Sequence, residues 1–122
     1  MINDNYLIGM ANLAGNLPYS IPAYLAVGST TGVLTSGDLV TSGEFDRNAC
    51  SSPVVSTNVV KYIGSRTSVE AGNEYINVVG FHNSSVPFSS GNLQVNFLVP
   101  SLLHASTFDI EIEAWISFNR GT

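Results

Sequence analysis

The chain has 122 residues, the usual length of one domain, and such a chain can bury a core without disulfide bonds or a metal ion. Only 11 % of its residues are charged, against about 25 % in an average globular domain. This favours a subunit that hides surface against neighbours over a surface that is merely rich in Ser and Thr. The net charge of −5 argues against a nucleic-acid partner, as does the scatter of the four cations, Arg47, Lys61, Arg66 and Arg120.

Residues 1–22 form an N-terminal arm that differs from the rest of the chain. Its apolar residues follow no sustained period, and glycines and prolines interrupt it. Residues 6–13 fit a short helix capped by Asn5, and an extended arm is the alternative. A free, solvated tail would contain fewer Leu, Ile and Tyr residues, so we expect the arm to bind its own domain or a neighbouring subunit. The predicted assembly contacts are Leu7, Ile8, Met10, Leu13, Leu17, Tyr19 and Ile21.

Residues 23–122 show strand signals spaced by turns. The predicted strands are 23–29, 44–50, 54–64, 74–82, 92–99 and 107–119, with a Gly/Thr/Ser loop over 28–43 and a stop at Pro100. No convincing helical stretch follows residue 22. The pattern predicts an all-β fold, an antiparallel β-sandwich of jelly-roll type with about six to eight strands.

The last predicted strand has the clearest alternation in the chain. One face is apolar, and the other holds Asp109, Glu111 and Glu113 beside a single aromatic residue, Trp115. We expect the acids to form a solvated face, opposite Lys61 or Arg66 on a neighbouring strand. An exposed Trp115 marks either a protein contact or a sugar platform, and the N-terminal arm could instead cover it.

The order of elements resembles a family of small tailed-bacteriophage virion proteins, some of them stand-alone and some at the base of tail fibres. The resemblance covers about residues 23–120. It rests on segments 24–28, 44–47, 71–73, 76–81, 91–93 and 110–118. It implies a non-enzymatic structural role in the virion. The family usually carries an acidic residue at the position of Val78. Arg47 therefore needs another partner, and Glu44 and Glu74 are the candidates.

Glu44 and Arg47 are predicted to be structural polar residues. Three positions apart in a regular strand, their side chains point to opposite faces, so they can pair only if the chain bends or bulges. Arg47 shares its face with Phe45 and Ala49. We favour a buried, paired arginine there over an interface residue.

No catalytic, cofactor-binding or metal-ligating residues are predicted, and we expect no enzyme activity and no cofactor. His82 and His104 belong to no metal-binding pattern, and His82 is predicted to be a loop histidine. No GxSxG elbow occurs. Cys50, the single cysteine, is expected to be a buried small hydrophobe.

The function expected from these observations is that of a phage capsid decoration or cement protein, located in the virion. It would form a homo-oligomer such as a trimer and contact the major capsid protein or tail proteins. A tail-fibre or baseplate component is the alternative, and a carbohydrate-binding module using Trp115, Tyr62 or Tyr75 is the second. The first basic residue is Arg47 and no apolar run approaches about 18 residues, so neither a signal peptide nor a membrane span is expected.

Overall fold

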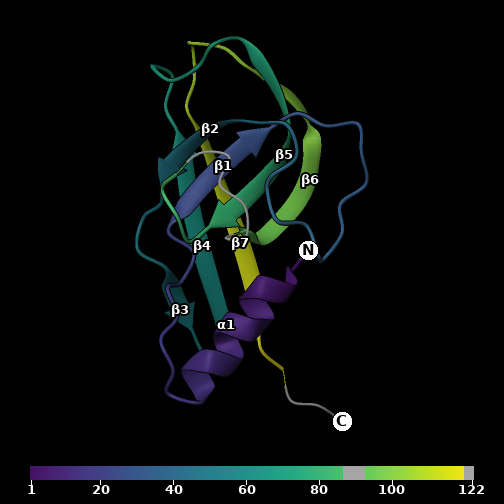
Figure 1. Cartoon of the computed structure of the whole chain (residues 1–122). Coiled ribbons are helices and arrows are strands. Elements are labelled where there is room, and N and C mark those ends of the chain that lie inside the picture. Colours follow the sequence, from purple (N-terminus) through teal and green to yellow (C-terminus); the bar gives the residue numbers. More distant parts are fainter. Residues whose placement is uncertain (87–92, 120–122) are drawn as a thin grey trace.

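The computed structural model describes residues 1–86 and 93–119 and shows seven strands and one short helix (Figure 1). The elements are α1 (Asp4–Ala14), β1 (Tyr24–Gly28), β2 (Glu44–Ala49), β3 (Val54–Ser56), β4 (Val59–Arg66), β5 (Glu74–His82), β6 (Leu93–His104) and β7 (Ile110–Ser117). The all-β prediction is confirmed at the level of a mostly-β chain with one short helix, and so is the predicted number of six to eight strands. Gly91, Asn92 and Arg120, which entered the sequence argument, lie outside the described residues.

The strands form two antiparallel sheets. The large sheet has the order β2-β1-β5-β6, and the small sheet has the order β3-β4-β7. The chain crosses from one sheet to the other after β2, after β4 and after β6. A sandwich of two sheets is therefore confirmed at this level.

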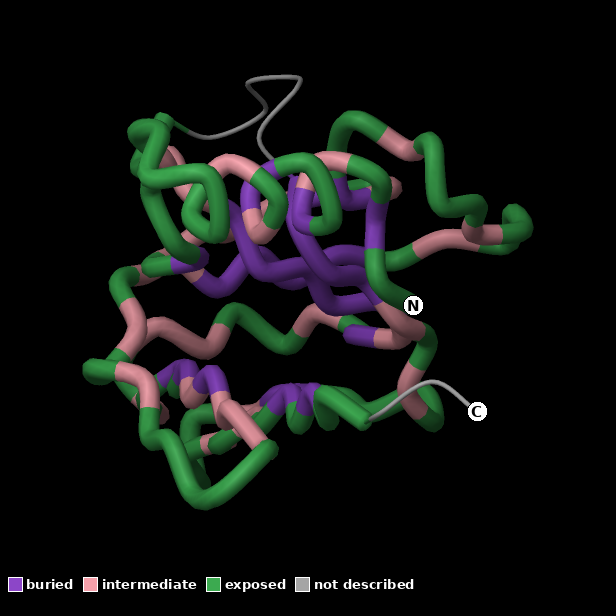
Figure 2. Tube along the Cα trace, turned by 90° about the horizontal axis from the view of Figure 1, so that it is seen from below, coloured by how far each residue is buried: buried purple, intermediate pink, exposed green. Residues whose placement is uncertain are grey.

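The core lies between the sheets. Leu25, Val27 and Phe81 of the large sheet pack with Tyr62 and Ile116 of the small sheet, and the buried stretches lie inside a periphery of exposed loops (Figure 2). The outer face of the large sheet is also covered, because Ala26, Val78 and Gly80 are buried as well. A strand that is covered on both faces loses its alternation, which explains the continuous apolar sequence of β5.

The predicted strand 54–64 is a hairpin rather than one strand. Ser56 pairs with Val59, and Thr57 in the turn has a positive φ of 54°. Such a turn usually contains Gly or an Asn-Gly pair, so Thr57-Asn58 gave no turn signal within a β-branched run.

The predicted end of a strand at Pro100 is wrong, because β6 continues to His104. β6 is an edge strand, and its register with β5 slips between the partners of Ile76 and Val78, where Pro100 lies. Proline is tolerated at an edge and at a bulge, where no neighbouring strand needs its missing N–H.

The N-terminal arm contains a helix that packs on its own sandwich. The N-cap is Asn3 rather than the predicted Asn5, and the Asn3 side chain donates to the carbonyl of Asp38 instead of capping the helix. Ile2 forms a β-bridge with Val95, so the residues before the helix extend the edge of β6. Tyr6 enters the core with 1 % of its surface exposed.

Candidate functional site

The N-terminal arm exposes several large apolar side chains. We define the helix patch as five predicted contact residues whose exposed fractions range from 40 to 59 %, namely Leu7, Ile8, Leu13, Leu17 and Ile21. Asp4 is the only charged residue of α1. A solvated helix normally turns charged and polar residues outward, so this surface is built like one that a partner covers.

The other two predicted contact residues point inward. Met10 packs against the core. Tyr19 donates its hydroxyl to Gln94 Oε1 and lies against Gly9, where an added Cβ would come within 2.0 Å of the Tyr19 ring. Met10 and Tyr19 therefore fix the arm to its own sandwich and do not belong to the helix patch.

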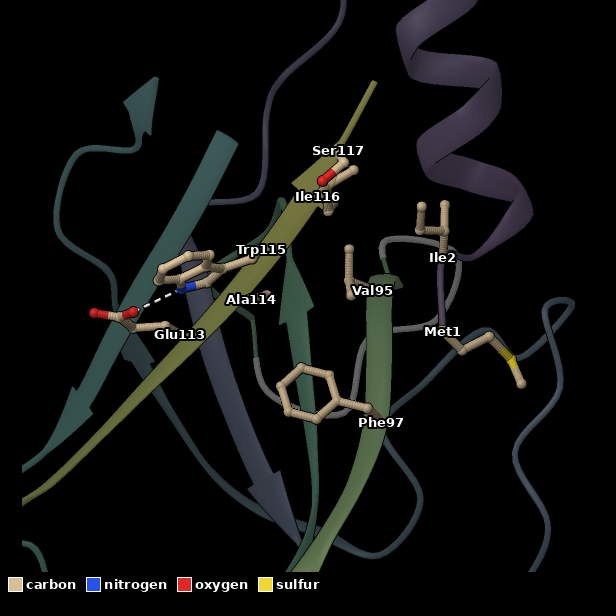
Figure 3. A pocket seen from close by; sticks show the side chains of 9 residues that line it. All are labelled: Met1, Ile2, Val95, Phe97, Glu113, Ala114, Trp115, Ile116 and Ser117. Carbon is tan, nitrogen blue, oxygen red and sulfur yellow. Dashed lines mark hydrogen bonds between the residues drawn. The ribbon is translucent and has the colours of Figure 1, made fainter. Parts of the chain in front are cut away.

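Trp115 is 64 % exposed, so the alternative in which the arm covers it is wrong. Its Nε1 donates to Glu113 Oε2 at 2.6 Å, and Lys61 Nζ lies 4.8 Å from the centre of the indole ring. Figure 3 shows Trp115 and Glu113 on one side of β7, and Val95, Phe97 and Ile2 across from them. These residues line a pocket of about 330 Å³ along the β7 edge.

The candidate sugar-binding residues are not brought together as one platform. Tyr62 is only 3 % exposed and belongs to the core, so it is unavailable to a glycan. Tyr75 is 59 % exposed but lies on β5 in the large sheet, whereas Trp115 lies on β7 in the small sheet. Trp115 and Tyr75 are thus both accessible to a sugar ring, but they lie on different sheets and do not form one platform.

Glu44 and Arg47 form a buried ion pair. Arg47 Nε and Nη2 donate to the two Glu44 carboxylate oxygens at 2.9 and 2.7 Å, and the side chains are 0 % and 1 % exposed. The register with β1 slips between Val27 and Gly28 and leaves Phe45 as the extra residue. This bulge brings the two side chains to one face, so of the two proposed partners Glu44 is the one that Arg47 pairs with.

Arg66 is the centre of a second buried network, which the sequence analysis missed. Its Nε donates to Asp46 Oδ2 at 2.8 Å, its Nη1 donates to His104 Nδ1 at 2.9 Å, and its Nη2 donates to the Glu70 carbonyl at 2.8 Å. The guanidinium lies 5.4 Å from the Phe45 ring centre. Because Asp46 and His104 belong to the large sheet and Arg66 to the small one, the network joins the sheets.

The expectation that Arg66 faces the acidic row of the last strand is therefore wrong. Ser65 pairs with Glu111, and Arg66 pairs with Ile110 on the inner face. The predicted strand ended at residue 64. Had the predicted strand been extended to residue 66, the alternation of side chains would have placed Arg66 on the inner face with Tyr62 and Gly64. This alternation was the signal in the sequence that could have identified Arg66 as buried.

Both histidines serve as internal hydrogen-bonding groups. His82 belongs to β5, is fully buried and hydrogen-bonds Thr41 Oγ1 through Nε2 at 2.7 Å, so its prediction as a loop residue is wrong. His104 Nδ1 accepts from Arg66, because a guanidinium only donates. Its Nε2 then carries the proton that is donated to the Phe108 carbonyl at 2.8 Å.

Neither the Cys50 thiol nor the acidic and histidine side chains among the described residues form a reactive or metal-binding site. Burial raises the pKa of the Cys50 thiol to about 11, so the thiol stays protonated at neutral pH and is a poor nucleophile. Among residues 1–86 and 93–119 there is no group of three or more His, Cys, Asp and Glu side chains that could hold a metal ion. Within the same ranges no helix is long and apolar enough to cross a membrane.

We compared the chain with models of known protein families, with curated protein sequences and with solved structures, and none of them matches it.

Proposed function

We propose that the protein is a non-enzymatic structural subunit of a tailed-phage virion, and that it decorates or cements the capsid through the helix patch. The partners in this proposal are further copies of the chain and the major capsid protein. The chemistry it requires is burial of apolar surface, with no cofactor and no reaction.

The observation that carries this proposal is the exposed apolar side of the arm. The five side chains of the helix patch are each roughly half exposed, and covering them offers on the order of 5 kcal/mol before the cost of association. Met10, Tyr6 and Tyr19 hold the helix against the sandwich, so the three patch residues on α1 are presented by a fixed element. A partner then loses little free energy in ordering it.

A jelly-roll type of connectivity is part of the same proposal. The three crossings between the sheets, after β2, β4 and β6, support it. The low content of charged residues supports a subunit whose surface is shared with neighbours.

The test is to measure how many copies of the chain a purified phage particle holds, by quantitative mass spectrometry of a phage that encodes it. A decoration protein is expected in numbers comparable with the major capsid protein. A tail-fibre or baseplate component, the alternative within this class, would be present in few copies. Absence from the particle would refute both.

The contact surface is tested with the double variant Leu7→Ser/Ile8→Ser, added to particles that lack the protein. We expect it to fold normally and to lose binding, because both side chains are exposed and contribute to the patch. Val69→Ser is the matched control, since Val69 is 93 % exposed and lies outside the arm. Equal binding by both variants would remove the helix patch from the proposal.

Carbohydrate binding is the second candidate, favoured by the 64 % exposed Trp115 beside Lys61 and Glu113. An exposed indole with polar neighbours can stack on a sugar ring and hydrogen-bond its hydroxyls. Glycan-array binding that disappears in Trp115→Ala, with Tyr75→Ala as the control, would establish it.

A further inference from the structure

The two sheets have four edge strands, and three of them carry protection against pairing with another chain. β3 has only three residues. β2 has a bulge at Phe45. β6 contains Pro100 and two register slips, and Ile2 bridges to it at Val95. Short length, bulges, prolines and covering segments are the known devices that prevent edge-to-edge pairing.

β7 carries none of these four devices, although two charged residues, Glu111 and Glu113, are exposed on its outer face. Its eight residues pair with β4 in an unbroken register, and its sequence contains no Pro, Gly or Lys. It is the end strand of the small sheet, so its other edge has no strand partner among the described residues. A long, regular edge of this kind is a template for strand addition.

One hydrogen bond shows which backbone N–H and C=O groups of β7 point to its free edge. The Phe118 N–H donates to the Asn58 carbonyl at 2.8 Å, so the backbone of Phe118 points toward the hairpin that leads into β4. The direction alternates along an antiparallel strand. The N–H and C=O groups of Glu113 and Trp115 therefore point to the free edge, and so do those of Glu111 and Ser117.

We propose that β7 pairs with β7 of a second copy, antiparallel, with the two-fold axis at Ala114. In this register Glu113 lies opposite Trp115 of the second copy, and Ile112 lies opposite its Ile116. The Glu113 and Trp115 backbones exchange both N–H···O=C bonds across the interface. The small sheets of the two copies then form one continuous sheet.

The sequence of β7 selects this register over its neighbours. An axis at Glu113 sets that carboxylate opposite its own copy, and an axis at Ile112 sets Glu111 opposite Glu113. Like charges directly opposite each other destabilise a strand pair. An axis at Trp115 avoids these contacts but shortens the paired segment. The axis at Ala114 combines a long pairing with no acid opposite an acid.

The packing agrees with the same register. Ala114 points into the core, and its backbone turns away from the free edge, so the central Ala114 pair is the narrow, non-hydrogen-bonded kind. The smallest side chain of the strand thus occupies the closest approach. Next to it lies the 330 Å³ pocket with Val95 and Phe97, where the apolar Ile112 and Ile116 of the second copy would add contacts. This surface is separate from the helix patch, and the proposal does not depend on a role in the virion.

The first experiment measures the mass of the full chain by sedimentation between micromolar and millimolar concentration. We expect a shift from 13.0 kDa toward twice that mass in the wild type. Glu113→Pro removes one N–H from the free edge, leaves the bonds to β4 in place, and should remain monomeric. Glu113→Ala removes the same side chain, keeps the N–H, and should still dimerise. Circular dichroism confirms the fold of each variant.

The second experiment tests the register and does not require proline to be tolerated. In a Cys50→Ser background, Ala114→Cys places two thiols across the axis at a spacing that a disulfide can bridge, about 4.4–6.8 Å between Cα atoms. Ile112→Cys is the control, because it lies opposite Ile116. We expect a strong preference for cross-linking at position 114.

Three results would overturn the proposal: a wild type that is monomeric over the whole range, a folded Glu113→Pro variant that dimerises like wild type, or equal cross-linking at positions 114 and 112. If a monomeric wild type bound particles and Glu113→Pro alone lost that binding, the edge would belong to a strand of another protein.

Discussion

The hydroxyl pair between Tyr6 and Tyr62 gives the sharpest stability prediction. The two oxygens lie 3.0 Å apart, both side chains are buried, and the rings meet edge to face. Tyr6→Phe leaves the Tyr62 hydroxyl buried without this partner, and Tyr62→Phe does the same to Tyr6. Each single variant should lose about 1–3 kcal/mol of unfolding free energy. The double variant removes both polar groups and should recover most of that loss.

The assay is urea unfolding of the wild type, the two single variants and the double variant. For a chain of this size 1 kcal/mol corresponds to about 4 °C in Tm, so thermal melts provide a second reading. Tyr75→Phe is the control, because Tyr75 is 59 % exposed and should change little. The reasoning is refuted if the double variant loses the sum of the two single losses.

The same pair predicts how stability depends on pH. Burial raises the pKa of both hydroxyls above the ordinary value near 10, with the Tyr6 hydroxyl adding to the effect at Tyr62. The unfolded chain therefore releases these protons first as the pH rises. The contribution of the pair is complete below about pH 10 and is lost above it. The double Phe variant should show a smaller loss of stability there.

Three further predictions follow from single sites. Arg66→Ala should destabilise by about 3–5 kcal/mol, because it leaves Asp46 and His104 without their shared donor, and a smaller loss in chemical denaturation would contradict that view. Cys50 should react slowly with iodoacetamide at pH 8 in the folded chain and quickly in urea, since burial raises its pKa to about 11, and equal rates would contradict the burial. Gly80→Ala should lower Tm by several degrees, because its Cβ would lie 2.0 Å from Thr41 Oγ1; an unchanged Tm would show that the 28–43 loop can yield.

The sequence correctly predicted the strands whose apolar pattern can be recognised within the strand itself. The bounds of 74–82 match β5, and the alternation of 107–119 correctly predicted β7 with its acids outside. Arg66 was misjudged because it lies at the end of a strand, where predicted boundaries are least certain. Because the predicted strand ended at residue 64, two residues too early, Arg66 was predicted to be a surface charge although it is buried. The bounds of the predicted strand 74–82 included His82, but its side chain was assigned to the loop that follows.

The missed features depend on contacts between segments far apart in the chain. The Glu44–Arg47 pair needs a bulge, and the position of that bulge is set by the register with β1. The strand through Pro100 needs an edge position, which only the sheet order reveals. The exposed fractions of the helix patch likewise depend on how α1 meets β6. A single sequence shows the residues involved but not the distant segments that they contact. Those contacts determine the bulge, the edge position and the exposed fractions.

The helix is synthesised well before the strands β4 and β6, on which it packs. It ends at Ala14 and β6 begins at Leu93, an interval that corresponds to on the order of ten seconds of synthesis at typical rates. During that time Tyr6 and Met10 have no core to enter, and the apolar arm is free to meet other nascent chains. Folding must then wait for pairings between distant segments, which are intrinsically slow. Slower translation would lengthen this exposure, so the soluble yield should depend on how rapidly β5 and β6 follow.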